Sequence, residues 1–281
     1  MAKFSRIIFI VLYIILVGSF VTSAQVNAVV FGKNRVQYKK FKWQYYQTKN
    51  FNTYFNQGGQ ELAKFVLQVA EEELPAIETF TEYSLQRRAN IVLYNEFADM
   101  QQSNIGLSDD DWQSSTGGTK LVNNKLVVYF NGDHANLRKQ VREGIARVLT
   151  NNLLFGEDLG EIAGNQALLD LPIWLTNGYI AYAGENWSTS LDDKLKSEIL
   201  SGNYSNFYKF AYDQPELAGH AFWYYIQEKY KKENVTYLLY LARIYKNLNR
   251  ACQQVCKSSF KEVLADFMTF EEEKYYKEIT M

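Results

Sequence analysis

The chain has 281 residues, with 30 lysines and arginines against 31 aspartates and glutamates, and a formal net charge of −1. This balance excludes a protein that binds nucleic acid or another polyanion mainly through its net charge. A chain of this length can bury a sizeable core, and its three prolines and lack of a low-complexity linker favour one large domain. The aromatic content of 16% is high, and core packing is its commonest explanation.

The first 24 residues have the pattern of a secretory signal peptide. Lys3 and Arg6 form a short basic head, and residues 7–21 are an almost uninterrupted apolar run. About 15 apolar residues are few for the roughly 20 that a membrane-spanning helix needs, and the small residues 22–24 offer a cleavage site. We therefore expect an exported protein of the periplasm or cell envelope, without membrane insertion after cleavage. A retained membrane anchor is the alternative.

The rest of the chain is predicted to contain mixed strands first and helices second. Residues 35–55 are aromatic-rich with partial alternation, which predicts a hairpin of two strands. Residues 60–82 carry apolar positions at helical spacing and predict a long amphipathic helix. A short apolar strand is predicted over 90–94 and a short helix over 95–103. Residues 120–130 predict a second hairpin, which ends in the strongest strand of the chain.

The predicted fold class is α+β. A helix is predicted after residue 133 because apolar residues between Leu137 and Leu149 share one helical face, and further helices follow beyond residue 168. A mixed sheet in the N-terminal half is therefore expected to pack on a mostly helical C-terminal half. The expected division is a signal peptide at 1–24, an α+β subdomain at 25–135 and a helical subdomain at 136–281, the last two forming one unit.

Three segments carry a resemblance to a known family. They are VREGIARVLTNNLLFG from Val141, LPIWLTNGYIAY from Leu171 and AGHAFWYYIQEKY from Ala218, in that order after a strong strand. With them the chain resembles the peptidase MA-like branch of the gluzincin metallopeptidases. The resemblance implies a thermolysin-like fold. Such modules often precede a TolB-like β-propeller in exported proteins of Bacteroidetes-type bacteria.

The resemblance also implies that the zinc site is lost. An active gluzincin binds zinc through an H-E-x-x-H helix and the glutamate of a later W-x-x-E-G-x-A-x-Y segment. In this chain Glu143 and Arg147 fall at the two histidine positions, Gly144 at the general base and Asn177 at the third ligand. The expected protein is a pseudo-metallopeptidase with no catalytic residue, no metal and no cofactor.

The replaced positions have a chemistry of their own. Glu143 and Arg147 are at i and i+4 with the acid nearer the helix start, so they are predicted to form an ion pair in the former cleft. The alternative is that they are two unrelated surface residues. Trp174, Tyr182 and His220 are candidate cleft contacts, although a histidine held in or near the core is the more ordinary interpretation of His220.

Other candidate sites have weaker support. The two histidines, His134 and His220, lack the H-x-x-x-H spacing of a zinc site. The aspartates at 109–111 lack the alternating ligands of a calcium loop, which favours a solvated turn. Trp112 and Trp187 lie at ends of predicted elements, where a peptide or sugar could stack on them.

The two cysteines, Cys252 and Cys256, are four apart in a segment predicted to be helical. Side chains on one helical face make poor disulfide geometry. A bridge and two buried thiols both remain open at this stage.

Three functional hypotheses follow. The leading one is a catalytically inactive peptidase-like module that binds or scaffolds a protein or peptide partner in the cell envelope, in a secretion or surface-assembly complex. The alternative is a metal-independent or rearranged-site hydrolase acting on peptides or cell-wall glycans, with carboxylates such as Glu143 and Glu161. The third is that a longer C-terminal region does the work.

Overall fold

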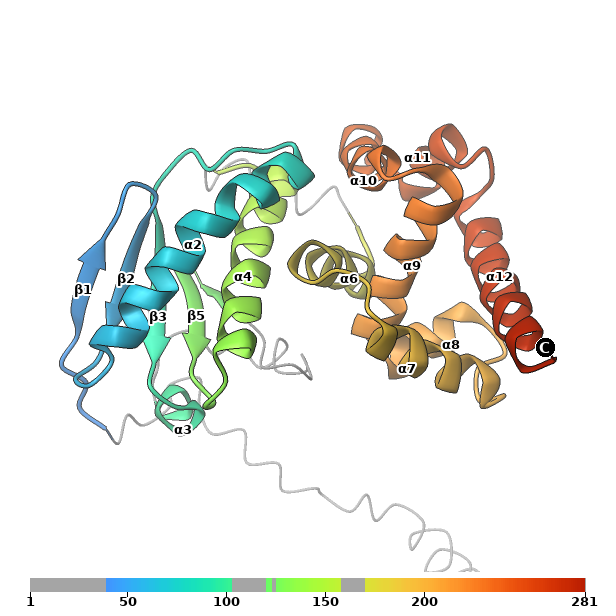
Figure 1. Cartoon of the computed structure of the whole chain (residues 1–281). Coiled ribbons are helices and arrows are strands. Elements are labelled where there is room, and N and C mark those ends of the chain that lie inside the picture. Colours follow the sequence, from blue (N-terminus) through green and yellow to red (C-terminus); the bar gives the residue numbers. More distant parts are fainter. Residues whose placement is uncertain (1–38, 103–119, 123–124, 158–169, 281) are drawn as a thin grey trace, which may run out of the picture. The chain divides into compact units, whose positions relative to one another are not determined.

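The structure is a computed structural model that describes residues 39–102, 120–122, 125–157 and 170–280, and Val36–Met281 form one compact unit. The predicted signal peptide, the aspartates at 109–111, Trp112 and Glu161 lie outside the described residues. Strands come first along the described chain and helices dominate its second half, as Figure 1 shows. The α+β class is therefore confirmed at this coarse level.

The five strands form one mixed sheet in the order β1-β2-β3-β5-β4. The pairs β1/β2 and β4/β5 are antiparallel, which confirms both predicted hairpins, and the pairs β2/β3 and β3/β5 are parallel. Parallel neighbours need a long crossover, which α2 provides between β2 and β3. The strands are β1 (Gln44–Gln47), β2 (Phe51–Phe55), β3 (Ala89–Tyr94), β4 (Lys120–Val122) and β5 (Lys125–Tyr129).

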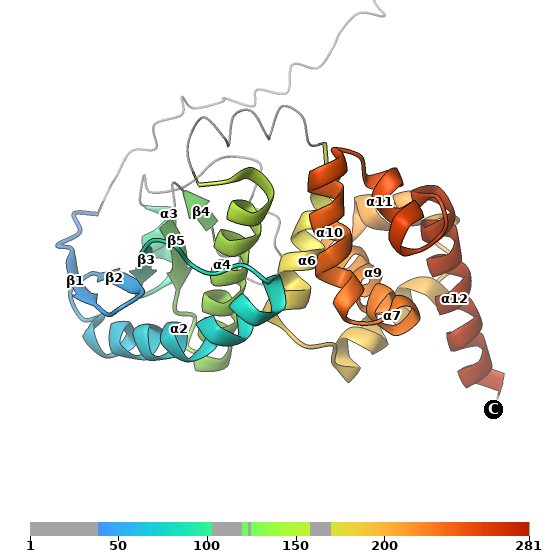
Figure 2. The same ribbon diagram turned by 90° about the horizontal axis from the view of Figure 1, so that it is seen from above.

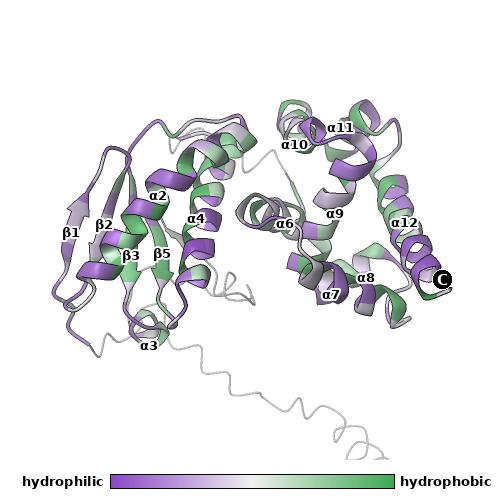
Figure 3. Ribbon diagram, viewed as in Figure 1, coloured by the Kyte–Doolittle hydropathy of each residue, from purple (hydrophilic) through white to green (hydrophobic). Residues whose placement is uncertain are grey.

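Two long helices cover one face of this sheet. The predicted helices are confirmed as α2 (Gln60–Thr81) and α4 (His134–Phe155), and both lie against the same face in Figure 1. Figure 3 shows that β3 and β5 are largely hydrophobic. This composition is typical of parallel strands, since both of their faces are usually covered. The opposite face packs against the segment of Phe41 and Trp43 and against the short helix α3 (Phe97–Gln101).

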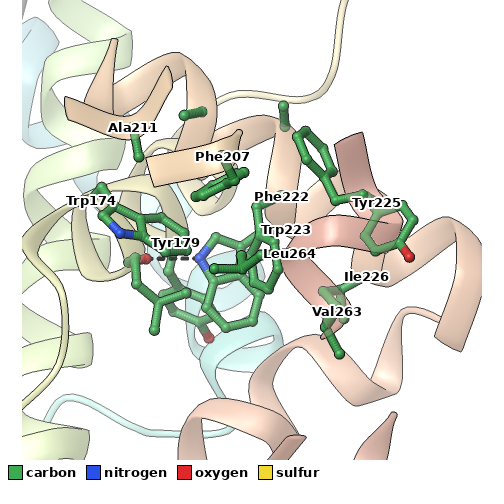
Figure 4. Packing of buried hydrophobic residues seen from close by; sticks show 14 of the residues in the cluster. Trp174, Tyr179, Phe207, Ala211, Phe222, Trp223, Tyr225, Ile226, Val263 and Leu264 are labelled. Carbon is green, nitrogen blue, oxygen red and sulfur yellow. Dashed lines mark hydrogen bonds between the residues drawn. The ribbon is translucent and has the colours of Figure 1, made fainter. Parts of the chain in front are cut away.

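The second half contains seven described helices around an aromatic core. Figure 4 shows Trp174, Phe207, Phe222 and Trp223 packed together in this core, and the Trp223 indole donates a hydrogen bond of 2.8 Å to the carbonyl of Leu175. Much of the aromatic content is therefore core, as expected. The helices are α6 (Ile173–Gly184), α7 (Thr189–Leu200), α8 (Phe207–Asp213), α9 (Pro215–Tyr230), α10 (Glu233–Tyr245), α11 (Leu248–Val255) and α12 (Phe260–Thr280).

Helix α6 connects the two halves, since it contacts both α4 and α9. It lies between them in Figures 1 and 2. The core of the sheet extends along α4 to Leu149, whereas Leu153 and Leu154 of the same helix belong to the core of the helical half. The boundary expected at residue 135 would therefore separate α4 from the sheet, although most of α4 packs on that sheet.

Two glycines set how closely α6 and α9 approach. A Cβ atom added at Gly178 would lie 2.3 Å from the backbone of Gly219, and one at Gly219 would lie 2.2 Å from the carbonyl oxygen of Trp174. Neither position has room for a side chain. The glycines therefore let the two backbones meet directly, which fixes the depth at which α6 lies under α9.

Cys252 and Cys256 are free, buried thiols in and directly after α11, so the thiol alternative holds in the structure. Across the stretches that the structure describes, the search for a helix both long and apolar enough to cross a bilayer found none.

Substituting Gly178→Ala should destabilise the fold by about 3 kcal/mol, because the new methyl group would force α6 and α9 apart. The matched control is Gly202→Ala, which has a φ of 71° and no neighbouring atom within 4 Å of the added Cβ. It should cost only the left-handed backbone penalty of about 1 kcal/mol. Urea unfolding of both variants measures the difference, and equal losses would contradict the close approach of the helices.

Candidate functional site

Glu143 and Arg147, which the resemblance assigns to the positions of zinc ligands, lie on α4 where it faces α6. The helix starts at the cap residue Asp133, whose carboxylate accepts a 2.8 Å hydrogen bond from the backbone N–H of Ala135. One face of α4 is buried in the core beside the sheet through Leu137, Val141 and Ile145. Burial of this face fixes the direction of the turn that carries Glu143 and Arg147. The position predicted for the general base, Gly144, is buried in this same turn.

Arg147 and Asn177, two of the three residues that the resemblance assigns to ligand positions, are in contact. The Nη1 of Arg147 donates a 3.2 Å hydrogen bond to the Oδ1 of Asn177, which joins α4 to α6. Both residues are half-buried. The fold thus brings together two side chains that are 30 residues apart in the sequence. A guanidinium group at this place repels a divalent cation instead of binding it.

The predicted ion pair between Glu143 and Arg147 is not the one that forms. Glu143 is buried, and its Oε1 lies 3.7 Å from the Nζ of Lys139, one helical turn earlier. Both neighbours are four residues away and compete for the carboxylate. Arg147 turns to α6 instead, where Asn177 accepts its hydrogen bond. Arg147 still lowers the pKa of Glu143 through its charge.

Burial dominates the acidity of Glu143. Desolvation raises its pKa to about 7, because little water reaches the carboxylate. The charges of Lys139 and Arg147 lower the pKa, and those of Glu216 and Glu185 raise it. Glu143 therefore changes its charge near neutral pH.

The Lys139 ammonium lies among the carboxylates of Glu143, Glu185 and Glu216. Its Nζ lies 2.5 Å from the Oε2 of Glu185, at the end of α6. The charges of Glu143 and Glu216 also raise the pKa of Lys139. The end of α6 lies directly over α4, since a Cβ atom at Gly184 would sit 2.4 Å from the Cγ of Glu143. One ammonium therefore serves three carboxylates drawn from α4, α9 and the end of α6.

His220 on α9 is a buried neighbour of this group. It is 2% exposed, and burial lowers its pKa to about 4, with the charge of Lys139 adding to the effect and Glu185 opposing it. The imidazole is therefore neutral at pH 7. The rings of Tyr182 and Trp187 contact it edge-on at centroid distances of 5.9 and 5.3 Å. These contacts agree with the ordinary interpretation, a histidine at the edge of the core.

A cavity of about 400 Å³, here called the His220 cavity, opens beside these residues. Lys139, Glu185, Glu216 and His220 contribute to its wall. The rest of the wall comes from the first turn of α7 and from the residues around the start of α9, namely Ser188, Ser190, Leu191, Lys194, Asp213, Gln214, Pro215 and Leu217.

A second cavity of about 410 Å³, the Tyr182 cavity, has an aromatic wall. Trp187 and Tyr224 stack there at a centroid distance of 4.8 Å, and the Trp187 indole donates a 3.2 Å hydrogen bond to Asp192. Trp187 is half-buried and held from both sides, so it lines the cavity as a fixed wall. Arg142 also lines it and pairs with the buried Glu73 of α2.

The predicted cleft contacts therefore separate. Tyr182 and His220 each line one of the two cavities, whereas Trp174 lines neither and packs at 9% exposure in the helical core. His134 lies at the start of α4 between the rings of Phe65 and Phe130. The rearranged-site alternative invoked Glu143 with Glu161, and the latter lies outside the described residues.

Sequence reasoning missed the residues that gather around Glu143. Lys139 could have been found from its i, i+4 spacing to Glu143, which is the same signal that pointed to Arg147. Glu185 and Glu216 carried no signal, because the packing of α6 and α9 on α4 brings them close.

Comparison with known proteins adds no assignment to this geometry. The chain matches no protein-family model, and no curated protein matches it. Within the described stretches, no group of three or more histidine, cysteine, aspartate or glutamate side chains is arranged to hold a metal ion.

Substituting Glu143→Gln should change how stability depends on pH. The folded pKa of Glu143 is raised, so the folded state keeps a proton that the unfolded state releases, and stability falls as pH rises from 4.5 to about 7. The lowered pKa of His220 acts in the opposite sense, and stability rises between about 4 and 6.5. The two trends nearly offset each other in the native protein.

With Glu143 replaced, the rise due to His220 is no longer offset by Glu143, and the contribution of His220 to the unfolding free energy should increase by about 2 kcal/mol from about pH 5 to about pH 8. Urea unfolding at several pH values measures this, with Glu273→Gln on the exposed surface of α12 as the control. Parallel curves for the native protein and Glu143→Gln would contradict the buried titration.

Proposed function

We propose that this protein is a catalytically inactive, peptidase-like module of the cell envelope that binds or scaffolds a protein or peptide partner. The observation that carries the proposal is the hydrogen bond between Arg147 and Asn177, which occupies two of the three places where a gluzincin would hold zinc. Glu143, at the remaining place, lies against Lys139. The ammonium group of Lys139 and the guanidinium group of Arg147 supply positive charge where catalysis would need a bound cation.

The fold supports the proposal through its order of elements. A mixed sheet, a long helix on that sheet, and a second helix that brings Asn177 to Arg147 follow one another as the resemblance to gluzincins implies. The gluzincin-like fold itself, the export and the place in a secretion or surface-assembly complex belong to the proposal. The two cavities beside α6 supply concave surfaces of the size that small ligands or side chains occupy.

Zinc content and chelator sensitivity test the proposal directly. Residues 25–281 purified without added metal should carry no stoichiometric zinc, and a broad set of peptide substrates should show no cleavage that a chelator removes. Tightly bound zinc at one per chain, or chelator-sensitive cleavage, would refute the inactive module. Cleavage that resists the chelator would instead support the rearranged-site hydrolase.

A further inference from the structure

Helix α10 is apolar on both of its faces. Its inner face is completely buried in the helical core, through Val235, Leu238 and Leu239. Its outer face carries Tyr237, Tyr240 and Ile244, here called the α10 stripe, and these side chains are 44%, 41% and 52% exposed. The spacing of three and four residues places them in one row along the helix. Because a helix that is apolar all round is normally covered on every side, the α10 stripe indicates a binding surface.

The chain around the α10 stripe is strongly basic. Residues 231–261 include seven lysines and arginines and a single acid, Glu233, so this stretch has a formal charge of +6, although the whole chain has −1. The seven are Lys231, Lys232, Arg243, Lys246, Arg250, Lys257 and Lys261. The stretch covers α10, α11 and the first residues of α12. An excess of one sign on one surface favours partners of the opposite sign.

Part of this charge lies next to the stripe. Arg243 follows Tyr240 by three residues, so the two are neighbours on the surface of α10. The guanidinium group of Arg250 in α11 lies 4.6 Å from the ring centroid of Tyr245, at the end of α10. Among the described residues, neither Arg243 nor Arg250 has a carboxylate within ion-pair distance. Both guanidinium groups can therefore pair with an anion from outside the chain.

The charge and the width of the stripe decide between its possible occupants. A second copy would use the same face of both chains, so a two-fold contact would bring two basic stretches together. An anionic membrane would match the charge, but a helix that lies in a membrane interface buries a broad apolar face, and this stripe is a single row of half-exposed side chains. A single row is what one helix packs against another.

We propose that α10 binds an amphipathic helix of a partner protein, in which aspartates and glutamates flank the apolar row. The apolar row packs along Tyr237, Tyr240 and Ile244, and the flanking carboxylates pair with Arg243 and Arg250. This inference rests on the binding role proposed above and names its partner. Zinc content and peptide cleavage test the inactive module, whereas the experiment below measures binding at α10, so the two proposals can fail separately.

A synthetic peptide tests the inference on the purified chain. The peptide has about 20 residues, enough for a helix longer than α10, with leucines in one row, glutamates on both sides of that row and alanines elsewhere. It should bind in calorimetry, and its affinity should fall as salt is added. The same peptide with lysines in place of the glutamates should bind at least tenfold more weakly, because its charges would face those of Arg243 and Arg250.

Substitutions then locate the contact. Ile244→Ser shortens the apolar row and Arg243→Gln removes a cation, and each should weaken binding of the glutamate peptide about tenfold. The matched controls on α12 are Ile279→Ser, at a site that is 59% exposed, and Lys277→Gln, and both should leave the affinity unchanged. Circular dichroism checks that each variant is folded. No binding of the glutamate peptide, equal binding of the lysine peptide, or unchanged binding by either folded α10 variant would each overturn the inference.

Two further measurements separate the other occupants. Sedimentation of the purified chain should show no dimer that depends on the stripe, and a dimer that Ile244→Ser converts to a monomer would assign the stripe to a second copy. Flotation with phosphatidylglycerol vesicles should show no binding, and vesicle binding that Ile244→Ser abolishes would assign the stripe to a membrane. Either result would overturn the inference.

Discussion

The structure depends on the packing of α6 between α4 and α9, which buries charged side chains that the sequence places far apart. Gly178 and Gly219 let α6 and α9 approach until their backbones touch. Arg147 and Asn177 join α4 to α6, and Lys139 joins α4 to Glu185 at the end of α6. Because these groups are withdrawn from water, each must find a partner of suitable charge or shift its pKa. The acidity of Glu143 and the neutral state of His220 follow from this packing.

The same packing explains why the region differs from a metal centre in its chemistry. A gluzincin-type zinc site needs two neutral imidazoles and a carboxylate that converge on one point. Here the side chains that converge are already complementary to each other: Arg147 with an amide oxygen, and Lys139 with two carboxylates. Internal partners of this kind stabilise the contact between the two halves.

Most of the fold could be predicted from local sequence patterns, and most of the charge cluster could not. The hairpins, α2 and α4 have clear periodicities, so their positions were found within a few residues. The meeting of Arg147 and Asn177 was implied only by the resemblance to gluzincins. The partner of Glu143 was mistaken because i+4 and i−4 neighbours are equivalent in spacing, and only the direction of α6 decides between them. Trp174 was assigned to the cleft, whereas the aromatic core of the helical half holds it.

We propose that Glu143, Arg147 and Asn177 of α4 and α6 stand at the positions of a zinc centre whose ligands have been replaced by mutually compatible side chains. Putting the ligands back tests it most directly, by zinc titration of the variant with Glu143→His, Arg147→His and Asn177→Glu together. The account predicts that this variant binds one zinc per chain, and that the variant without Asn177→Glu binds it at least tenfold more weakly. A folded triple variant that binds zinc no better than the native chain would contradict the claim.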